Sequence, residues 1–213
     1  MPLQVKICGL TNSADAHVAA EAGAAMLGFV FFPSSPRNLS LQEAKNLGKS
    51  LPEGPDRVGV FVNPDNAFLD NAIRTLSLDW VQLHGTESPE RVHEIQAGFN
   101  VGIIKALSIS TEKDLTAIKA YTPFVDAFLF DAKPEKDSAL PGGNGLSFDW
   151  SLLKNYPMEK PWLLAGGLSL KNLEKAIEQS GAEAVDLSSS LEKTAGKKDP
   201  ALIKAFLQAA SML

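Results

Sequence analysis

The stretch LQVKICGLTNSADAHVAAEAGAAMLGFVF, residues 3–31, decides the fold. Its two ends, Leu3–Ile7 and Met26–Phe31, are short runs of Val, Ile, Leu and Phe that are too short for helices. Between them lies the alanine-rich segment Ser13–Ala22, which is typical of a helix and stops at Gly23, a common residue after a helix end. Strands that are apolar on both faces belong to parallel sheets covered by helices, so this stretch predicts a β-α-β unit.

The same pattern recurs along the rest of the chain. We interpret six further apolar runs as strands: Val58–Val62, Trp80–Leu83, Val101–Lys105, Ala127–Phe130, Trp162–Leu164 and Ala184–Leu187. Helical segments separate them, near Asp65–Thr75, Thr111–Tyr121, Phe148–Asn155 and Leu170–Gln179, and after the capping sequences Ser40-Leu-Gln-Glu43, Ser88-Pro89 and Asp199-Pro200. Eight near-regular units predict an α/β protein, a (β/α)₈ TIM barrel of the phosphate-binding type, with residues 1–213 as a single domain. An open doubly wound sheet is the alternative.

Composition excludes several classes of function. The chain has 213 residues, 45% hydrophobic and 21% charged, with a net charge of −5, which argues against general binding to nucleic acid or to anionic membranes. No apolar run approaches the ~20 residues of a membrane span, and the N-terminus lacks the apolar core of a signal peptide. We therefore expect a cytoplasmic enzyme. A lone cysteine, Cys8, allows neither an intrachain disulfide nor a cysteine cluster for zinc.

In a TIM barrel, functional residues gather where the strands end at their carboxyl side. The residues that follow the expected strands should therefore converge on one face: Cys8, Arg37, His84, Asp131, Gly166, Gly167, Ser188 and Ser189. The long polar segment Lys133–Gly145, after the sixth strand, is a candidate mobile loop over that face.

The last two of these loops predict a phosphate site. Gly166 and Gly167 let the backbone come close to a ligand, and Ser188 and Ser189 offer hydroxyls and amides. Phosphate bound by the loops after strands seven and eight is a recurring feature of such barrels. The plainer interpretation is that the two glycines only form a turn.

Cys8 and Asp131 are the candidates for proton transfer. A thiolate at a strand end can act as a base, and a carboxyl beside apolar walls can keep a proton and donate it. Lys6 lies on the same side of the first strand as Cys8, and we expect it to pair with Asp186 of the eighth strand and to favour the thiolate. Most single cysteines are only core residues, and a loop carboxylate is more often solvated, so these plainer alternatives stay open.

Arg37 could bind a substrate carboxylate through paired hydrogen bonds, and His84 could be a base or a structural donor. No motif for a metal, nucleotide or flavin is visible, so we expect no cofactor and no metal. The set suits acid–base chemistry on a phosphorylated small molecule.

Several motifs resemble those of phosphoribosylanthranilate isomerases of tryptophan biosynthesis, in the same order and over nearly the whole chain. They are VKICGLT (5–11), GFVF (28–31), VGVFVN (58–63), VQLHG (81–85), FDAK (130–133), GGNGLSFDW (142–150), AGGL (165–168) and VDLSS (185–189). KICG and VQLHG are the most specific of these motifs.

The resemblance implies an Amadori rearrangement of a phosphorylated aminoaldose. Asp131 would protonate the furanose ring oxygen and open the sugar to a Schiff base, and Cys8 would then remove the proton from C2. Arg37 would face the anthranilate carboxylate, and the four glycine and serine residues above would surround the phosphate. His84 matches a family motif without a defined role. The binding partner implied by the resemblance is a small phosphorylated substrate. The chain itself would be a monomer or a homodimer.

Two departures and three alternatives stand beside this interpretation. The family commonly has Gly at the position of Ser190, where a positive φ would strain serine, and Lys at the position of Leu146.

A related isomerase of histidine biosynthesis would use two aspartates, whereas the first strand here ends in Cys8. A metal-dependent sugar-phosphate epimerase would need more histidine and carboxylate ligands than the strand ends offer. A catalytically silent phosphate binder, or a scaffold partner in a pathway complex, is the alternative of a different class.

Overall fold

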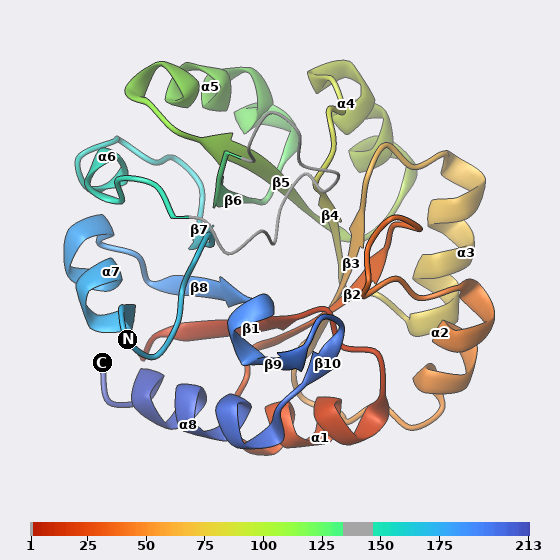
Figure 1. Ribbon diagram of the computed structural model, residues 1–213. Coiled ribbons are helices and arrows are strands. Elements are labelled where there is room, and N and C mark those ends of the chain that lie inside the picture. The colour runs from red at the N-terminus through yellow and green to blue at the C-terminus, as the bar shows by residue number, and fades with distance from the viewer. Residues whose placement is uncertain (1, 134–146) are drawn as a thin grey trace.

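The computed structural model describes residues 2–133 and 147–213, in which eight parallel strands close into a barrel (Figure 1). The strands are β1 (Gln4–Cys8), β2 (Met26–Phe31), β3 (Asp56–Phe61), β4 (Trp80–Leu83), β5 (Gly102–Ile109), β6 (Ala127–Ala132), β7 (Trp162–Leu164) and β8 (Ala184–Leu187). Each pairs with the next, and β8 pairs with β1 with Lys6 opposite Asp186. This last pairing confirms the predicted TIM barrel and excludes the open sheet.

Helices form a ring around the barrel (Figure 1). They are α1 (Ser13–Glu21), α2 (Leu41–Gly48), α3 (Asn66–Leu76), α4 (Pro89–Gly98), α5 (Ile118–Tyr121), α6 (Ser151–Lys154), α7 (Leu173–Ser180) and α8 (Pro200–Ala210). The capping sequences act as predicted: Ser40 and Glu43 form a capping box, and the side chains of Ser88 and Asp199 cap α4 and α8. None of the described helices is long and apolar enough to cross a membrane.

The structure differs from the prediction at several element boundaries. Strand β5 continues to Ile109 and β6 to Ala132, because Ser108 and Ile109 pair with Asp131 and Ala132 beyond the apolar runs. The helix expected over 111–121 begins as a 3₁₀ helix, η1 (Glu112–Ala117), and a second one, η2 (Thr122–Phe124), follows α5. Helix α7 starts three residues later than expected, after a turn that the Asn172 side chain holds. Of the expected mobile loop only Lys133 lies within the described residues.

Side chains alternate between two cores, as the period of a strand requires. Along β6, Phe128 and Phe130 pack outward against the helices, whereas Ala127 and Leu129 face the barrel interior. Asp131 continues the inward set at the end of β6. The same alternation on β1 brings Lys6 and Cys8 inward, so the inward rows end in polar groups at the carboxyl side of the barrel.

The structure also contains a small two-stranded sheet between β8 and α8, which the apolar runs of the sequence do not predict. The 3₁₀ helix η3 (Ser189–Leu191) leads into β9 (Glu192–Thr194), which pairs antiparallel with β10 (Lys197–Lys198). Figure 1 shows this hairpin in front of β1. It stands next to the loop after β8, where the phosphate site is expected.

Candidate active site

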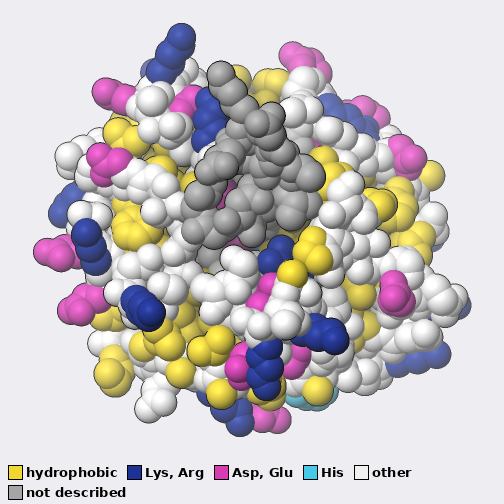
Figure 2. All heavy atoms as spheres, viewed as in Figure 1, with side chains coloured by type: hydrophobic (Ala, Val, Ile, Leu, Met, Phe, Trp, Pro, Cys, Tyr) yellow, Lys and Arg dark blue, Asp and Glu magenta, His cyan; other side chains and the backbone are white. Residues whose placement is uncertain are grey.

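A pocket at the carboxyl ends of the strands brings all the predicted site residues together. It is lined by the two proton-transfer candidates, Cys8 and Asp131, and by Arg37, His84, Gly166, Gly167, Ser188 and Ser189. Val30, Phe32, Val60 and Val62 give it an apolar side. On the face seen in Figure 2, Lys and Arg side chains are interspersed with Asp and Glu. The convergence predicted from strand ends is therefore observed.

Cys8 ends β1 and is almost buried, 7% exposed, beside Val30 and Val60. Burial raises the pKa of its thiol, while the nearby Lys6 ammonium lowers this pKa and Asp186 raises it. The predicted pair is present: Nζ of Lys6 donates to Oδ1 of Asp186 at 2.7 Å, and Lys6 is fully buried. Burial works against the charge of Lys6, but Asp186 and Cys8 raise the pKa of Lys6 above its usual value, so it stays an ammonium.

Gly28 makes room for this group of charges. A Cβ at Gly28 would stand 2.9 Å from Sγ of Cys8 and 3.1 Å from Nζ of Lys6. Any side chain on this inward position of β2 would therefore crowd both the thiol and the ammonium.

Asp131 and His84 face each other at the same level. Nε2 of His84 lies 3.6 Å from Oδ2 of Asp131, and the backbone N–H of Ala132 donates to Oδ1 of Asp131 at 2.8 Å. Nδ1 of His84 is held at 2.9 Å by the side-chain amide of Gln82, which is buried. Gly166 adopts φ 86° close by, where a Cβ would stand 3.0 Å from Oδ1 of Asp131. The loop after β7 can therefore approach the carboxyl.

Arg37 lies in the pocket, but one edge of its guanidinium already has a partner. Nε and Nη2 donate to Oε1 and Oε2 of Glu192 at 2.7 and 2.9 Å. Gly9, which has φ 77°, leaves room for this side chain, since a Cβ at Gly9 would stand 2.5 Å from Cδ of Arg37.

The loops after β7 and β8 have the open backbone that an anion site needs. Gly166 and Gly167 both have positive φ, and the Asn172 side chain bonds the carbonyl of Gly167 and the amide of Ser169. Ser190 lies in η3 without a positive φ, so the strain considered for serine at this position is absent. The other departure, Leu146, lies outside the described residues.

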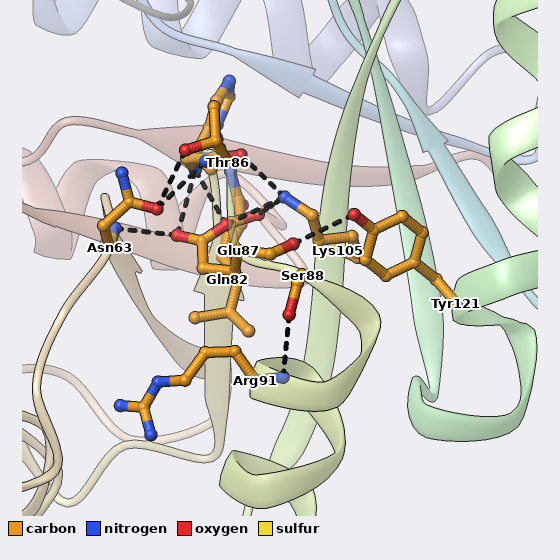
Figure 3. A network of polar contacts seen from close by, with 11 residues as sticks. Asn63, Gln82, Thr86, Glu87, Ser88, Arg91, Lys105 and Tyr121 are labelled. Carbon is orange, nitrogen blue, oxygen red and sulfur yellow. Dashed lines mark hydrogen bonds and ion pairs between the residues drawn. The ribbon is translucent and has the colours of Figure 1, made fainter.

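A buried ion pair supports the loops after β3 and β4, and Figure 3 shows the Glu87 carboxylate between Asn63 and Lys105. Nζ of Lys105 donates to Oε2 of Glu87 at 2.9 Å, and both side chains are nearly inaccessible. Oε1 of Glu87 accepts from the amides of Asn63 and Gly85 at 2.8 and 3.1 Å. The pair therefore fixes the backbone that follows His84.

The sequence model of the N-(5'phosphoribosyl)anthranilate (PRA) isomerase family matches residues 5–209. The chain belongs to this family. An N-(5'-phosphoribosyl)anthranilate isomerase from Cereibacter sphaeroides is 48% identical over 208 residues, covering 98% of both chains. One from Paracoccus denitrificans is 47% identical over 211 residues, covering 99% of this chain and 98% of the relative.

Solved phosphoribosylanthranilate isomerases share the fold. The Thermotoga maritima enzyme superposes with a TM-score of 0.88 at 37% identity, over 99% of this chain and all of that one. A phosphoribosyl anthranilate isomerase in complex with reduced 1-(o-carboxyphenylamino)-1-deoxyribulose 5-phosphate gives 0.85 at 36% identity, with the same coverage. The resemblance seen in the motifs is thus confirmed at the level of the family.

Sequence reasoning missed four polar or small residues in or beside this pocket: Gln82, Glu192, Lys198 and Gly28. The strand period in VQLH could have revealed Gln82, because it places Gln82 and His84 on the same inward row. No local pattern marks Glu192, whose partner Arg37 is 155 residues away.

Proposed function

We propose that this chain converts N-(5'-phosphoribosyl)anthranilate to 1-(2-carboxyphenylamino)-1-deoxyribulose 5-phosphate, the Amadori step of tryptophan biosynthesis, in the cytoplasm. Membership of the isomerase family supports the reaction, and the ligand of the solved relative described above supports the substrate class. The observation that carries the proposal is that Cys8 and Asp131 line one pocket together with the glycine and serine loops after β7 and β8.

In the proposed mechanism, Asp131 acts as the acid and Cys8 as the base. Asp131 gives a proton to the furanose ring oxygen, the bond from C1 to that oxygen breaks, and the nitrogen lone pair forms a protonated Schiff base. The Cys8 thiolate then removes the proton from C2, and the electrons of that C–H bond neutralise the Schiff base to give an enolamine. The enolamine becomes the ketone when C1 gains a proton and the C2 hydroxyl loses one.

The surroundings of each group suit these roles. The Lys6 ammonium offsets part of the cost of a buried thiolate at Cys8. His84 lies within reach of Asp131 and can stabilise the carboxylate that remains after the proton is given away. Substrate binding falls to Arg37 for the anthranilate carboxylate and to Gly166, Gly167, Ser188 and Ser189 for the phosphate.

The test is turnover of freshly prepared phosphoribosylanthranilate, followed by anthranilate fluorescence. We expect Cys8→Ala and Asp131→Asn each to lower kcat by about 10²–10⁴-fold. Both variants should retain affinity for the reduced product analogue, because neither group is assigned to binding. A wild-type chain that binds the analogue without any turnover would instead be a silent binder and would overturn the proposal.

A further inference from the structure

Glu192 is the centre of a buried charge cluster beside the pocket. Its Oε1 accepts from Nε of Arg37 at 2.7 Å and from Nζ of Lys198 at 2.9 Å, and its Oε2 accepts from Nη2 of Arg37 at 2.9 Å and from the amide of Gly196 at 3.1 Å. The three charged side chains are 8%, 4% and 1% exposed for Arg37, Glu192 and Lys198. Four donors on one buried carboxylate make this a built arrangement rather than a surface contact.

The geometry decides which part of Arg37 is available to a ligand. A planar guanidinium has a side edge, formed by Nε and one terminal nitrogen, and an end edge, formed by both terminal nitrogens. Each edge can bind a carboxylate through paired hydrogen bonds. Glu192 occupies the side edge. Within the described residues no carboxylate occupies the end edge, and Arg37 lines the pocket.

The same carboxylate reaches the loop after β8 through Lys198. Nζ of Lys198 donates to the carbonyl of Ser188 at 2.9 Å and to its hydroxyl at 3.2 Å. Glu192 thus links Arg37 to Ser188 by direct contacts. Two cations share one carboxylate, so the cluster keeps a net positive charge next to the pocket.

The partners of Glu192 favour its ionised form. Burial alone would raise the pKa of Glu192, but hydrogen bonds from Arg37 and Lys198 outweigh burial and hold it below the usual value. Burial lowers the pKa of Lys198, and Glu192 opposes that change. The carboxylate is therefore charged at neutral pH.

We propose that Glu192 is a positioning residue for substrate binding, which turns the end edge of Arg37 toward the substrate carboxylate and ties it to the loop after β8. This inference rests on the proposed function, because it assumes a substrate with a carboxylate at one end and a phosphate at the other. Glu192 itself is not among the residues that line the pocket. The competing interpretation is that Glu192 only anchors the β9–β10 hairpin.

The experiment compares Glu192→Gln with wild type, using the whole chain and two ligands in calorimetry. One ligand is reduced 1-(o-carboxyphenylamino)-1-deoxyribulose 5-phosphate, and the other is its anilino counterpart without the ring carboxylate. We expect Glu192→Gln to lower the affinity for the carboxylate ligand by about tenfold or more, and the affinity for the anilino ligand much less. In the activity assay KM should rise while kcat changes little, because binding and not proton transfer is altered.

Two further variants separate the outcomes. In an Arg37→Ala background, Glu192→Gln should no longer affect the preference for the carboxylate ligand. Lys198→Met leaves both contacts between Arg37 and Glu192 in place, so it is the control and should weaken binding of both ligands equally. If Glu192→Gln does not fold, Glu192→Asp replaces it, because this variant keeps the charge of the cluster but shortens the side chain by one methylene and cannot reach both nitrogens of Arg37 as before. Equal weakening of both ligands by Glu192→Asp would then overturn the proposal.

Equal weakening of both ligands by Glu192→Gln, or a lower Tm with unchanged affinities, would leave only the anchoring role and overturn the proposal. Failure of the proposed function looks different: wild type would show no turnover, whereas the two ligand affinities could still be compared.

Discussion

Two opposite charges in the barrel, Lys6 and Asp186, have the largest electrostatic effects on the pKa of Cys8. The side chains of Lys6 and Asp186 form a 2.7 Å ion pair inside the barrel, and they act on the thiol in opposite directions. Because burial raises the pKa of Cys8, the thiolate fraction increases with pH above neutrality. If the thiolate is the base, turnover should rise with pH until Cys8 is ionised.

Lys6→Met tests this arrangement. Removing the ammonium takes away the larger of the two charges that lower the pKa of Cys8, the smaller being Lys198, and leaves Asp186, which raises it, so the pKa should increase further. The rise of kcat/KM should then move to higher pH. Because Cys8 is the chain's single cysteine, its titration can be followed directly by the ultraviolet absorbance of the thiolate.

The matched control is Lys6→Met with Asp186→Asn, in which both charges are gone. Its pKa shift should be smaller than that of Lys6→Met alone. A thiol that titrates identically in wild type and in Lys6→Met would show that Lys6 only packs and pairs.

Among the elements, strands were easier to predict than the segments that follow them. Four strands, β2, β4, β7 and β8, have the predicted bounds, because buried parallel strands are marked by continuous apolar runs. Asp131 was expected just after a strand and lies within β6, since a charged residue ends an apolar run without ending backbone pairing. The β9–β10 hairpin carries no apolar run, and its place is fixed by contacts with Arg37.

The Glu87–Lys105 pair connects β4, β5 and the loop after β3, and it provides a prediction at this scale (Figure 3). Lys105→Met leaves the Glu87 carboxylate buried without its cation, so we expect the free energy of unfolding to fall by about 3–5 kcal/mol. Urea denaturation measures this change.

The double variant Lys105→Met with Glu87→Gln should recover much of that loss. The amide keeps an oxygen for the N–H groups of Asn63 and Gly85 and has no charge to leave unpaired. Additive losses in the two single variants, with no recovery in the double variant, would contradict this account of the pair.

At the scale of the whole molecule, we expect different residues to determine the stability of the barrel and the chemistry at its pocket. Predicting which residues meet at the pocket needed only the barrel topology, because closure brings all strand ends to one rim. The contacts between those residues, such as Arg37 with Glu192, depend on loop paths that leave no local pattern in the sequence. Closure itself is supported from outside, where α8 packs against α1 and completes the helix ring (Figure 1).

Phe206 of α8 tests this separation. Its side chain is fully buried in the layer between the strands and the helices. We expect Phe206→Ala to lower the free energy of unfolding by about 3–5 kcal/mol, because it removes buried apolar surface and leaves a cavity. Well below its Tm, kcat should stay close to that of wild type, since Phe206 is not among the pocket residues. Met212→Ala, at a side chain that is 78% exposed, is the control and should change neither quantity. A large fall of kcat in folded Phe206→Ala would mean that the helix layer and the pocket are coupled, and that stability and chemistry are not separate in this barrel.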